Sequence, residues 1–583
     1  MSVILAHAGV QAVGGGFLGV DVFFVISGYL ITTILKKDLE EGRYTLAAFY
    51  ERRARRILPA LLLVIGCSLP FAFWLMLPDF LQNFGQSVVA TLLFANNLLL
   101  ARTSGYWELE SNFKPLLHTW SLGVEEQFYL AFPIFLALLW RFGARVQITA
   151  ILLVGLASFA ISEHGWRTYP DVSFYLPTSR AWELMAGCAA AYVTRKPRAF
   201  DNFVSLLALL AIVLPMFLFD EHIPSPSYYS ALPVLGAVGV LLFSWPGTIA
   251  YRLLSLRPMV VIGLISYSAY LWHQPLFAFA RVASLTPPEP LEMAGLTLAT
   301  LALAWLSWRF VEQPFRDRKF MPLRLFIPIT AALTALFVAI GLVLHVKEGF
   351  PRWTYPNIAS AGEVYISYNE RVRRYTTDQF PGNGKPNVLL LGDSYGRDVG
   401  NILLEGKALE GKNLIYLQHY PACGSEDAFD PAVLKSLYAE ADLIVVALHT
   451  QGPGCVEKMD AQFAGIMNAR IIYFGSKDFG YNINPFGRIP MEDRAEAFAS
   501  LPEQEQEYND ALAAKLPAER YVDLVRLLGP DGKRLHFFDG QGNPLTPDRK
   551  HLTRYGALFV AEKIRAENPP AWQAIVEAER KAR

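Results

Sequence analysis

Long apolar runs dominate the chain up to residue 346, and shorter alternations of apolar and polar positions follow from residue 347 onward. A membrane-spanning helix needs about 20 mainly apolar residues, so the first part predicts a polytopic α-helical membrane domain. We expect about eleven spans, the first of them truncated: 1–13, 17–35, 57–77, 120–140, 147–161, 178–194, 203–219, 229–249, 258–280, 294–312 and 325–346. The second part predicts a domain that is exposed to water.

Charges in the loops indicate the orientation of these spans. Lys and Arg favour the cytoplasmic side, which places the basic segments 36–56 and 251–257 inside, whereas 284–292 has acidic residues and no Lys or Arg. The loop assignments agree only if 57–119 crosses the membrane once. We therefore expect 87–101 to lie on the outer face or to re-enter, and the C-terminal domain to lie outside the cytoplasm.

The overall composition and charge argue against a protein that binds nucleic acid. The 583 residues are 53% hydrophobic and 18% charged, and the formal net charge is zero. Without a basic field, the chain is not expected to bind nucleic acid.

Several polar side chains lie inside or at the ends of the predicted spans. Polar groups in a bilayer are costly and often functional, although each one taken singly is more often structural. Two pairs, Arg180 with Glu183 and Tyr270 with His273, are spaced three residues apart and share a helical face. The candidate polar cluster of the membrane domain is His118, Glu125, Glu126, Arg180, Glu183, Tyr270, His273 and Glu312.

Five ordered segments resemble the signatures of the membrane acyltransferase 3 family of O-antigen and exopolysaccharide O-acetyltransferases. They are "GGFLGVDVFFVISGYLITTIL", "ERRARRILPA", "LLHTWSLGVEEQFYLAFPI", "YSAYLWHQPL" and "WRFVEQPFR". The resemblance covers roughly residues 1–316. It implies transfer of an acyl group, usually acetyl, from cytoplasmic acyl-CoA to sugar hydroxyls outside the cytoplasm.

The resemblance also assigns His7 as the essential histidine of the first span, acting as an acid/base or as a transient acyl carrier. In the family an arginine lies eleven residues before this histidine, and that position would fall before residue 1. We therefore expect a misassigned start codon rather than an impaired protein.

A run of arginines, Arg52, Arg53, Arg55 and Arg56, follows the second span. Arginine suits phosphate recognition, so these side chains could bind the phosphates of CoA. Anchoring of the span on the cytoplasmic side explains the same residues equally well.

In the second half, an apolar strand, a tight turn and a helix are predicted over 385–403, with Ser394 directly after the strand. Further strands are predicted at 413–418, 442–448, 470–475 and 520–524, with helices between them. This alternation favours a parallel sheet with helices on both faces. At a helix N-terminus Ser394 could react near an oxyanion-stabilising site, or it could simply cap the helix.

Near the end of the chain, Asp548 and His551 are spaced three residues apart before a helix. Together with the "GDS" at Ser394, this block resembles the SGNH hydrolase and acyltransferase superfamily over about 386–566. The resemblance implies Ser394 as nucleophile, His551 as base and Asp548 as the residue that orients His551. Weak candidates for the oxyanion hole are Gly424, Thr450 and Gln451.

The four cysteines fall into two groups. Cys67 and Cys188 lie within spans and are expected to be small apolar fillers. Cys423 and Cys455 follow strands of the second half and could form a disulfide outside the cytoplasm. No spacing indicates a metal site, and no bound cofactor is expected.

The sequence thus predicts four regions: an acyltransferase membrane domain (1–324), a linking helix (325–346), a periplasmic connector (347–385) and a three-layer α/β, flavodoxin-like SGNH domain (386–583). We expect an O-acetyltransferase of the bacterial inner membrane. Its substrates would be acetyl-CoA and a cell-envelope polysaccharide such as lipopolysaccharide O-antigen or exopolysaccharide. The alternatives are a glycan esterase or deacetylase and a non-catalytic export scaffold. The acceptor hydroxyl and the oligomeric state stay open.

Overall fold

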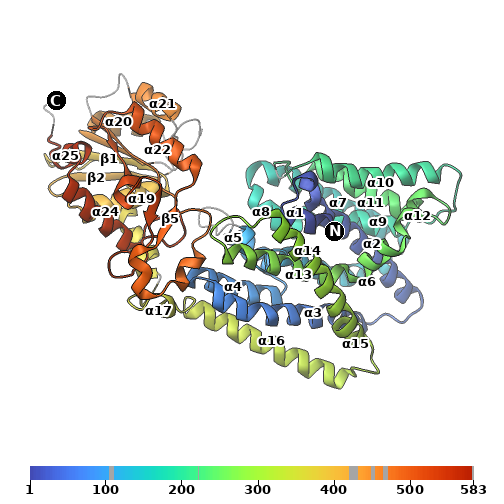
Figure 1. The fold of residues 1–583 in the computed structure, drawn as a ribbon. Helices are drawn as coiled ribbons and strands as arrows, with labels where there is room; N and C mark the ends of the chain where they lie inside the picture. Colours follow the sequence, from blue (N-terminus) through green and yellow to red (C-terminus); the bar gives the residue numbers. More distant parts are fainter. Residues whose placement is uncertain are drawn as a thin grey trace. The chain divides into compact units, whose positions relative to one another are not determined.

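The computed structural model describes residues 1–103, 111–220, 222–360, 362–418, 431–447, 453–463 and 470–580 (Figure 1). The chain forms two compact units. The first, the helical unit, comprises Met1–Trp74, Phe80–Arg281 and Pro288–Val346. The second, the α/β unit, comprises Leu75–Asp79, Val282–Pro287 and Lys347–Arg583.

Helices make up nearly all of the helical unit, because a helix satisfies its own backbone hydrogen bonds within an apolar stretch. In chain order they are α1 (Ser2–His7), α2 (Gly19–Glu40), α3 (Leu46–Leu75), α4 (Pro78–Leu92), α5 (Asn96–Thr103), α6 (Thr119–Trp140), α7 (Gly143–Thr168), α8 (Pro170–Tyr175), α9 (Pro177–Ala190), α10 (Asp201–Leu218), α11 (Ala231–Phe243), α12 (Ile249–Leu254), α13 (Arg257–Ala283), α14 (Pro290–Ser307), α15 (Gln313–Arg316) and α16 (Leu323–Val346). A 3₁₀ segment, Gln11–Leu18, joins α1 to α2, and a π-helical turn, Trp308–Glu312, joins α14 to α15.

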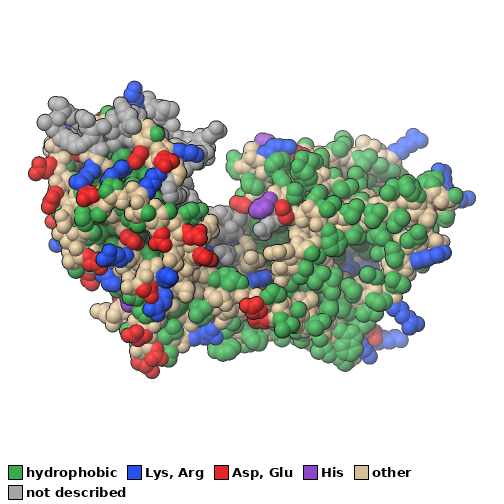
Figure 2. All heavy atoms as spheres, turned by 45° about the horizontal axis from the view of Figure 1, so that its top comes forward, with side chains coloured by type: hydrophobic (Ala, Val, Ile, Leu, Met, Phe, Trp, Pro, Cys, Tyr) green, Lys and Arg blue, Asp and Glu red, His purple; other side chains and the backbone are tan. Residues whose placement is uncertain are grey.

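Seven helical segments in the described part of the chain are long and apolar enough to cross a membrane: Gln11–Glu40, Leu46–Leu75, Thr119–Trp140, Gly143–Thr168, Asp201–Leu218, Pro290–Arg316 and Leu323–Val346. Of the most apolar 18-residue stretch of α7, only 17% is buried, as expected for a helix surface that faces lipid. Figure 2 shows hydrophobic side chains over much of the visible face of this unit. The protein is thus a multi-pass membrane protein.

The predicted number of about eleven spans is not confirmed. The spans expected at 1–13, 178–194, 229–249 and 258–280 are not among the seven. α1, α9 and α11 have 6, 14 and 13 residues, fewer than a perpendicular crossing of a bilayer requires.

The apolar run 87–101 is not one continuous helix. It is divided between α4 and α5 at Phe94, which has a φ of 53°. The side-chain amide of Asn96 is buried and donates to the carbonyl oxygen of Leu116 and to Thr119 Oγ1, at 2.9 and 2.8 Å. Neither helix is among the seven segments. The two asparagines that interrupt the run, Asn96 and Asn97, are buried and hydrogen-bonded within the protein.

Reciprocal glycines bring α2 and α9 into close contact. A Cβ atom on Gly28 would lie 2.0 Å from the carbonyl oxygen of Leu184, and one on Gly187 would lie 1.9 Å from that of Val25. The two backbones therefore touch, and this contact fixes the polar side chains of both helices relative to each other.

Five parallel strands form the central sheet of the α/β unit, in the order β2-β1-β3-β4-β6. They are β1 (Asn387–Gly392), β2 (Asn413–Leu417), β3 (Leu443–Ala447), β4 (Arg470–Phe474) and β6 (Tyr521–Val522). All residues of β1 and β3 are buried, as expected where both faces of a parallel sheet are covered. The prediction of a parallel α/β sheet, with strands at these places, is confirmed.

Helices cover both faces of this sheet (Figure 1). The helices of the α/β unit are α17 (Pro351–Thr354), α18 (Ser367–Arg373), α19 (Ser394–Glu405), α20 (Pro431–Glu440), α21 (Pro453–Phe463), α22 (Glu503–Lys515), α23 (Leu524–Leu528), α24 (Arg554–Glu567) and α25 (Pro570–Val576). Alternate positions of β1 separate the faces: Leu389 and Leu391 pack with α20, α21 and α22, whereas Leu390 lies beside Gly400 of α19.

The sequence did not indicate a second, two-stranded sheet. β5 (Phe498–Ser500) pairs antiparallel with β7 (Arg534–His536). Each strand has three residues, too few for a recognisable alternation of apolar and polar positions.

Candidate active site

Ser394 is the first residue of α19 and directly follows the turn after β1. Asp393 is the N-cap, and its carboxylate accepts a 2.9 Å hydrogen bond from the backbone N–H of Tyr395. The alternative that Ser394 itself caps the helix is therefore wrong. A Cβ on Gly392 would lie 2.3 Å from the carbonyl oxygen of Ala447, so glycine is needed where β1 turns into α19.

The position of Ser394 in the sheet is also informative. β1 lies between β2 and β3; the connection after β1 runs to β2 on one side, whereas the connection after β3 runs to β4 on the other, so the strand order reverses between β1 and β3. A crevice for ligands forms at such a switch point, at the carboxyl ends of the strands. Ser394 lies there, at the positive end of the α19 dipole.

Asp548 and His551 form a hydrogen-bonded pair, as the motif predicts. His551 Nδ1 lies 2.7 Å from Asp548 Oδ2, and the backbone N–H of His551 donates to Asp548 Oδ1 at 3.0 Å. Burial lowers the pKa of His551, but the charge and hydrogen bond of Asp548 outweigh it and raise that pKa above 6.5. Burial raises the pKa of Asp548, yet His551 and the backbone N–H groups lower it to about 2.

The segment that carries His551 packs against the first turns of α19. The rings of His551 and Tyr395, the residue after Ser394, are 6.2 Å apart between centroids. The backbone N–H of Leu552 donates to Asp398 on α19 at 3.1 Å. The structure thus brings the nucleophile candidate, the base candidate and its carboxylate into one region of the α/β unit.

Other predicted residues of this unit cannot be placed. Gly424, Thr450, Gln451 and Cys423 lie outside the described residues. Cys455 is buried and disulfide-bonded. Cys67 and Cys188 carry free thiols, and only Cys188 is buried, so the expected filler role fits Cys188 but not the exposed Cys67.

In the helical unit, His7 pairs with His273. His7 Nδ1 lies 3.1 Å from His273 Nε2, and His273 Nδ1 lies 2.6 Å from the carbonyl oxygen of Tyr270. A carbonyl oxygen only accepts, so His273 Nδ1 carries the proton and Nε2 of the neutral ring accepts from His7. It follows that a neutral His7 ring carries its proton on Nδ1 and its lone pair on Nε2, the form that a general base requires.

His118 and Tyr270 complete this cluster. The ring centroids of His118 and His273 are 5.2 Å apart, and the Tyr270 hydroxyl lies 2.8 Å from the His118 carbonyl oxygen and 2.6 Å from Ser121 Oγ. Both ring nitrogens of His118 are buried without a hydrogen-bond partner among the described residues. Such groups are costly in a protein interior, so His118 is a candidate ligand contact.

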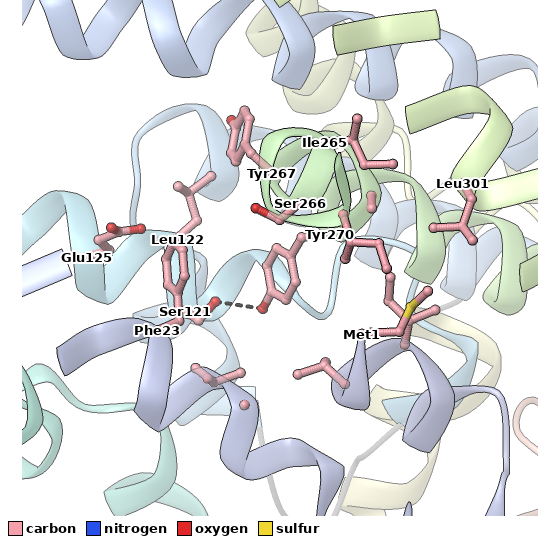
Figure 3. A pocket seen from close by; sticks show the side chains of 16 residues that line it. Met1, Phe23, Ser121, Leu122, Glu125, Ile265, Ser266, Tyr267, Tyr270 and Leu301 are labelled. Atoms are coloured by element: carbon pink, nitrogen blue, oxygen red, sulfur yellow. Dashed lines mark hydrogen bonds between the residues drawn. The ribbon is translucent and has the colours of Figure 1, made fainter. Parts of the chain in front are cut away.

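Two cavities meet at Tyr270. One of about 150 Å³ is lined mainly by apolar side chains, among them Ile4, Ile265 and Leu301. Figure 3 shows this cavity, with the Tyr270 hydroxyl bonded to Ser121 at its wall. The other, of about 40 Å³, is lined by Tyr270 and His7. A small acyl group could therefore lie next to the histidine pair.

Arg180 and Glu183 lie on α9, and Arg180 binds Asp21, a residue that the sequence motifs did not single out. Arg180 donates to Asp21 of α2 at 2.8 Å and to Glu183 at 3.2 Å, with all three side chains buried. Asp21 stands in a quoted motif, "GVDVFF", and a carboxylate inside a predicted span was the signal that could have revealed it. Arg180 and Asp21 line the same small cavity as His7.

Glu125 and Glu126 share one ion-pair group, and Glu312 belongs to another. Glu125 accepts from Ser27 at 2.6 Å and from the Tyr129 hydroxyl, and the Arg53 guanidinium lies 3.8 Å from Glu125 and 3.7 Å from Glu126. Glu312 accepts from Ser268 and from Arg316, the latter at 2.9 Å. The eight predicted polar residues therefore form several small groups instead of one cluster.

Three of the four arginines predicted for CoA are bound within the protein. Arg52 pairs with Asp38 at 2.7 Å, and Arg55 pairs with Glu51 at 2.8 Å and donates to two carbonyl oxygens. Arg53 lies over the Tyr129 ring. Only Arg56 forms no ion pair within 4.0 Å among the residues that the structure describes, so it is the member of this set best suited to an external phosphate.

Sequence reasoning also missed Lys477 and Asp398, which form a buried ion pair beside the Ser394 site. Neither belongs to a recognised motif. The available signal was position: Lys477 follows β4, at the edge of a parallel sheet where functional residues gather. Among the described residues, no three His, Cys, Asp or Glu side chains lie close enough together to hold a metal ion.

Comparison with known proteins matches residues 1–309 to the acyltransferase domain family. The chain is 30% identical over 345 residues to the peptidoglycan O-acetyltransferase OatA of Listeria monocytogenes, which covers 55% of this chain and 54% of that relative. It is 28% identical over 447 residues to the O-acetyltransferase OatA of Staphylococcus aureus, which covers 69% of this chain and 72% of the relative. The match thus spans about half of the Listeria protein. No solved structure matches.

Proposed function

Because the chain belongs to the acyltransferase family whose domain occupies residues 1–309, we propose that it is a membrane O-acetyltransferase that acts on a polysaccharide of the bacterial cell envelope. The observation that carries the proposal is the presence of two separate acid–base centres, the His7–His273 pair in one unit and the Asp548–His551 pair beside Ser394 in the other. Two centres suit a reaction whose donor and acceptor lie on opposite sides of a membrane.

In the proposed first step, cytoplasmic acyl-CoA reacts in the helical unit. The apolar cavity at Tyr270 would hold the acyl group, and Arg56 would bind a phosphate of CoA. His7 Nε2 either takes the acyl group itself or removes the proton from the group that accepts it, the C–S bond breaks and CoA leaves as a thiolate; the acylated group is then the carrier. Both roles need the unprotonated nitrogen that the hydrogen bond from His7 to His273 leaves.

In the proposed second step, Ser394 Oγ attacks the acyl carbonyl carbon while His551 takes its proton, and the carrier leaves with that proton. His551 then removes a proton from a glycan hydroxyl, whose oxygen attacks the acyl-serine and releases Ser394. The paired Asp548 holds the His551 ring and favours its charged form during both transfers. In this proposal the α/β unit lies on the outer side of the cytoplasmic membrane.

The relatives bear on the acceptor. The Listeria relative is named for peptidoglycan as its substrate, so we place a cell-wall glycan ahead of lipopolysaccharide O-antigen and exopolysaccharide. Acetyl is the acyl group in the names of both relatives, and acetyl-CoA is the proposed donor.

Ser394→Ala separates this function from its alternatives. Transfer through Ser394 predicts loss of O-acetyl groups from the cell-envelope glycan, measured by mass spectrometry of glycan from a complemented deletion strain. An esterase predicts more O-acetyl groups than in the wild type, and a non-catalytic scaffold predicts no change. Ser436→Ala, at an exposed serine of α20, is the matched control.

A further inference from the structure

A buried ion pair lies next to the Ser394 site. Lys477 Nζ is 2.6 Å from Asp398 Oδ2, and their side chains are 0% and 1% exposed. Asp398 stands four residues after Ser394 on α19, one helical turn further along, and Lys477 stands in the segment after β4. The pair therefore joins the helix that carries the nucleophile to the segment at the carboxyl end of β4.

Both members of the pair also bind the backbone around His551. Lys477 Nζ donates to the carbonyl oxygen of Lys550 at 2.9 Å, and Asp398 Oδ2 accepts from the N–H of Leu552 at 3.1 Å. Lys550 and Leu552 are the residues on either side of His551. One ion pair thus fixes the histidine segment at two points, before and after the ring.

A third contact connects the pair to the residue after the nucleophile. Lys477 Nζ lies 4.0 Å from the centroid of the Tyr395 ring, and the Tyr395 hydroxyl donates to the carbonyl oxygen of Lys477 at 2.5 Å. The ammonium group is therefore held between the start of α19 and the histidine segment.

We propose that Lys477 and Asp398 are positioning residues of the Ser394 site, which hold the segment of His551 against the helix of Ser394 and set the charge environment of the imidazole. The proposal rests on the function proposed above. Stability alone gives little reason to keep such a pair, because apolar residues of similar volume often replace a buried ion pair without loss of stability. The need to hold His551 in place to within about 1 Å gives a reason to keep the pair, since a displacement of that size can lower the rate about a hundredfold.

The charges near His551 give the proposal a distinctive signature. The groups that face the ring are Asp548, Asp398, Lys477, Tyr365 and Tyr395. Besides the effects of burial and of Asp548, Asp398 raises the pKa of His551 and Lys477 lowers it. Removal of one member should therefore shift the titration of His551 in the direction opposite to removal of the other.

The test uses the full-length protein in detergent micelles and hydrolysis of p-nitrophenyl acetate, followed as kcat and KM against pH. The variants are Asp398→Asn, Lys477→Met and Ser394→Ala. The control is Arg520→Met, which breaks a partly exposed ion pair with Asp460 elsewhere in the α/β unit. Thermal unfolding of each variant shows whether the fold is kept.

The expected result is a fall in kcat of about 10- to 100-fold with little change in KM for both pair variants. The acid limb of the pH profile should move to lower pH in Asp398→Asn and to higher pH in Lys477→Met, with Arg520→Met unchanged. If Lys477→Met does not fold, the direction in which the acid limb of Asp398→Asn moves decides alone whether the positioning role holds.

Two results would overturn the claims separately. An acid limb and a kcat like those of the wild type in the folded pair variants contradict the positioning role. Wild-type hydrolysis by Ser394→Ala contradicts the proposed function instead, because the ester would then react elsewhere.

Discussion

At the residue scale, each of the two candidate bases is a histidine whose ring is fixed by one neighbour. His273 accepts from His7 Nδ1, and Asp548 accepts from His551 Nδ1. In both cases the hydrogen bond leaves Nε2 as the reactive atom. The motifs of the sequence identified all four residues, because each motif is local in the chain. The pairing of His7 with His273 could not be predicted, since 266 residues separate them.

His273→Ala should reduce acyl transfer sharply. Without an acceptor at Nδ1, the His7 ring loses both its orientation and its tautomer, and general-base catalysis of this kind contributes about 10²- to 10⁴-fold. Transfer of labelled acetyl from acetyl-CoA to glycan in membrane vesicles measures the effect. The exposed His164 supplies the control, His164→Ala, which should transfer at the wild-type rate. Equal rates for the two variants would show that His273 does not act on His7.

The pH dependence of Ser394 chemistry should follow His551. Its pKa is raised above 6.5, and only the neutral ring accepts the proton of Ser394. Ester turnover should therefore rise as pH increases through that raised value. Asp548→Asn removes the cause of the raised pKa, so the acid limb should move to lower pH, and kcat should fall by about 10⁴ as in other triads. Full pH profiles of hydrolysis for both proteins test this, and an unshifted limb in Asp548→Asn would refute the assignment.

Asp548 and His551 change the stability of the folded protein with pH in opposite directions. The raised pKa of His551 makes its protonated form stabilising below 6.5, and that contribution is lost as pH rises through the raised value. The lowered pKa of Asp548 stabilises the folded protein above 3.8, and this contribution is lost as pH falls towards about 2.

At the scale of elements, the sheet was easier to predict than the membrane helices. Short runs such as 387–392 and 443–447 are fully apolar and bounded by turns, which identifies buried parallel strands. The prediction of a membrane span depends on the length and the polarity of the segment together. α9 has only 14 residues and carries Arg180 and Glu183. It packs on α2 through glycines, and the hydrophobic periodicity of the sequence does not reveal this contact.

Gly187→Val should destabilise the helical unit. Its side chain would meet the backbone of α2, where a Cβ already lies 1.9 Å from the Val25 carbonyl oxygen, and overpacking costs about 1–3 kcal/mol or more. The melting temperature in detergent and the yield of folded protein report the effect. Gly263→Ala on α13 is the control, because a Cβ there meets nothing within 4 Å. Equal melting temperatures would show that the α2–α9 contact is not needed.

At the scale of the whole molecule, the chain combines an acyltransferase domain within the membrane and an α/β unit with its own acid–base pair. In the proposed route neither centre is sufficient alone, because the acyl group starts from a cytoplasmic thioester and Ser394 receives it on the other side of the membrane. A single route that uses both centres in succession accounts for their presence in one chain.

The route predicts that the two centres act as a unit. Removal of either should stop transfer, and removal of both should have no larger effect, because residues that serve one sequence of steps are not additive. His7→Ala should still hydrolyse p-nitrophenyl acetate, since Ser394, Asp548 and His551 remain.

The most direct measurement is the O-acetyl content of cell-envelope glycan, by mass spectrometry, from a deletion strain complemented with wild type, His7→Ala, Ser394→Ala or the double variant at equal protein levels. The account predicts full acetylation in the wild type and the same background level in all three variants. Wild-type acetylation in either single variant would contradict a route that passes through both centres.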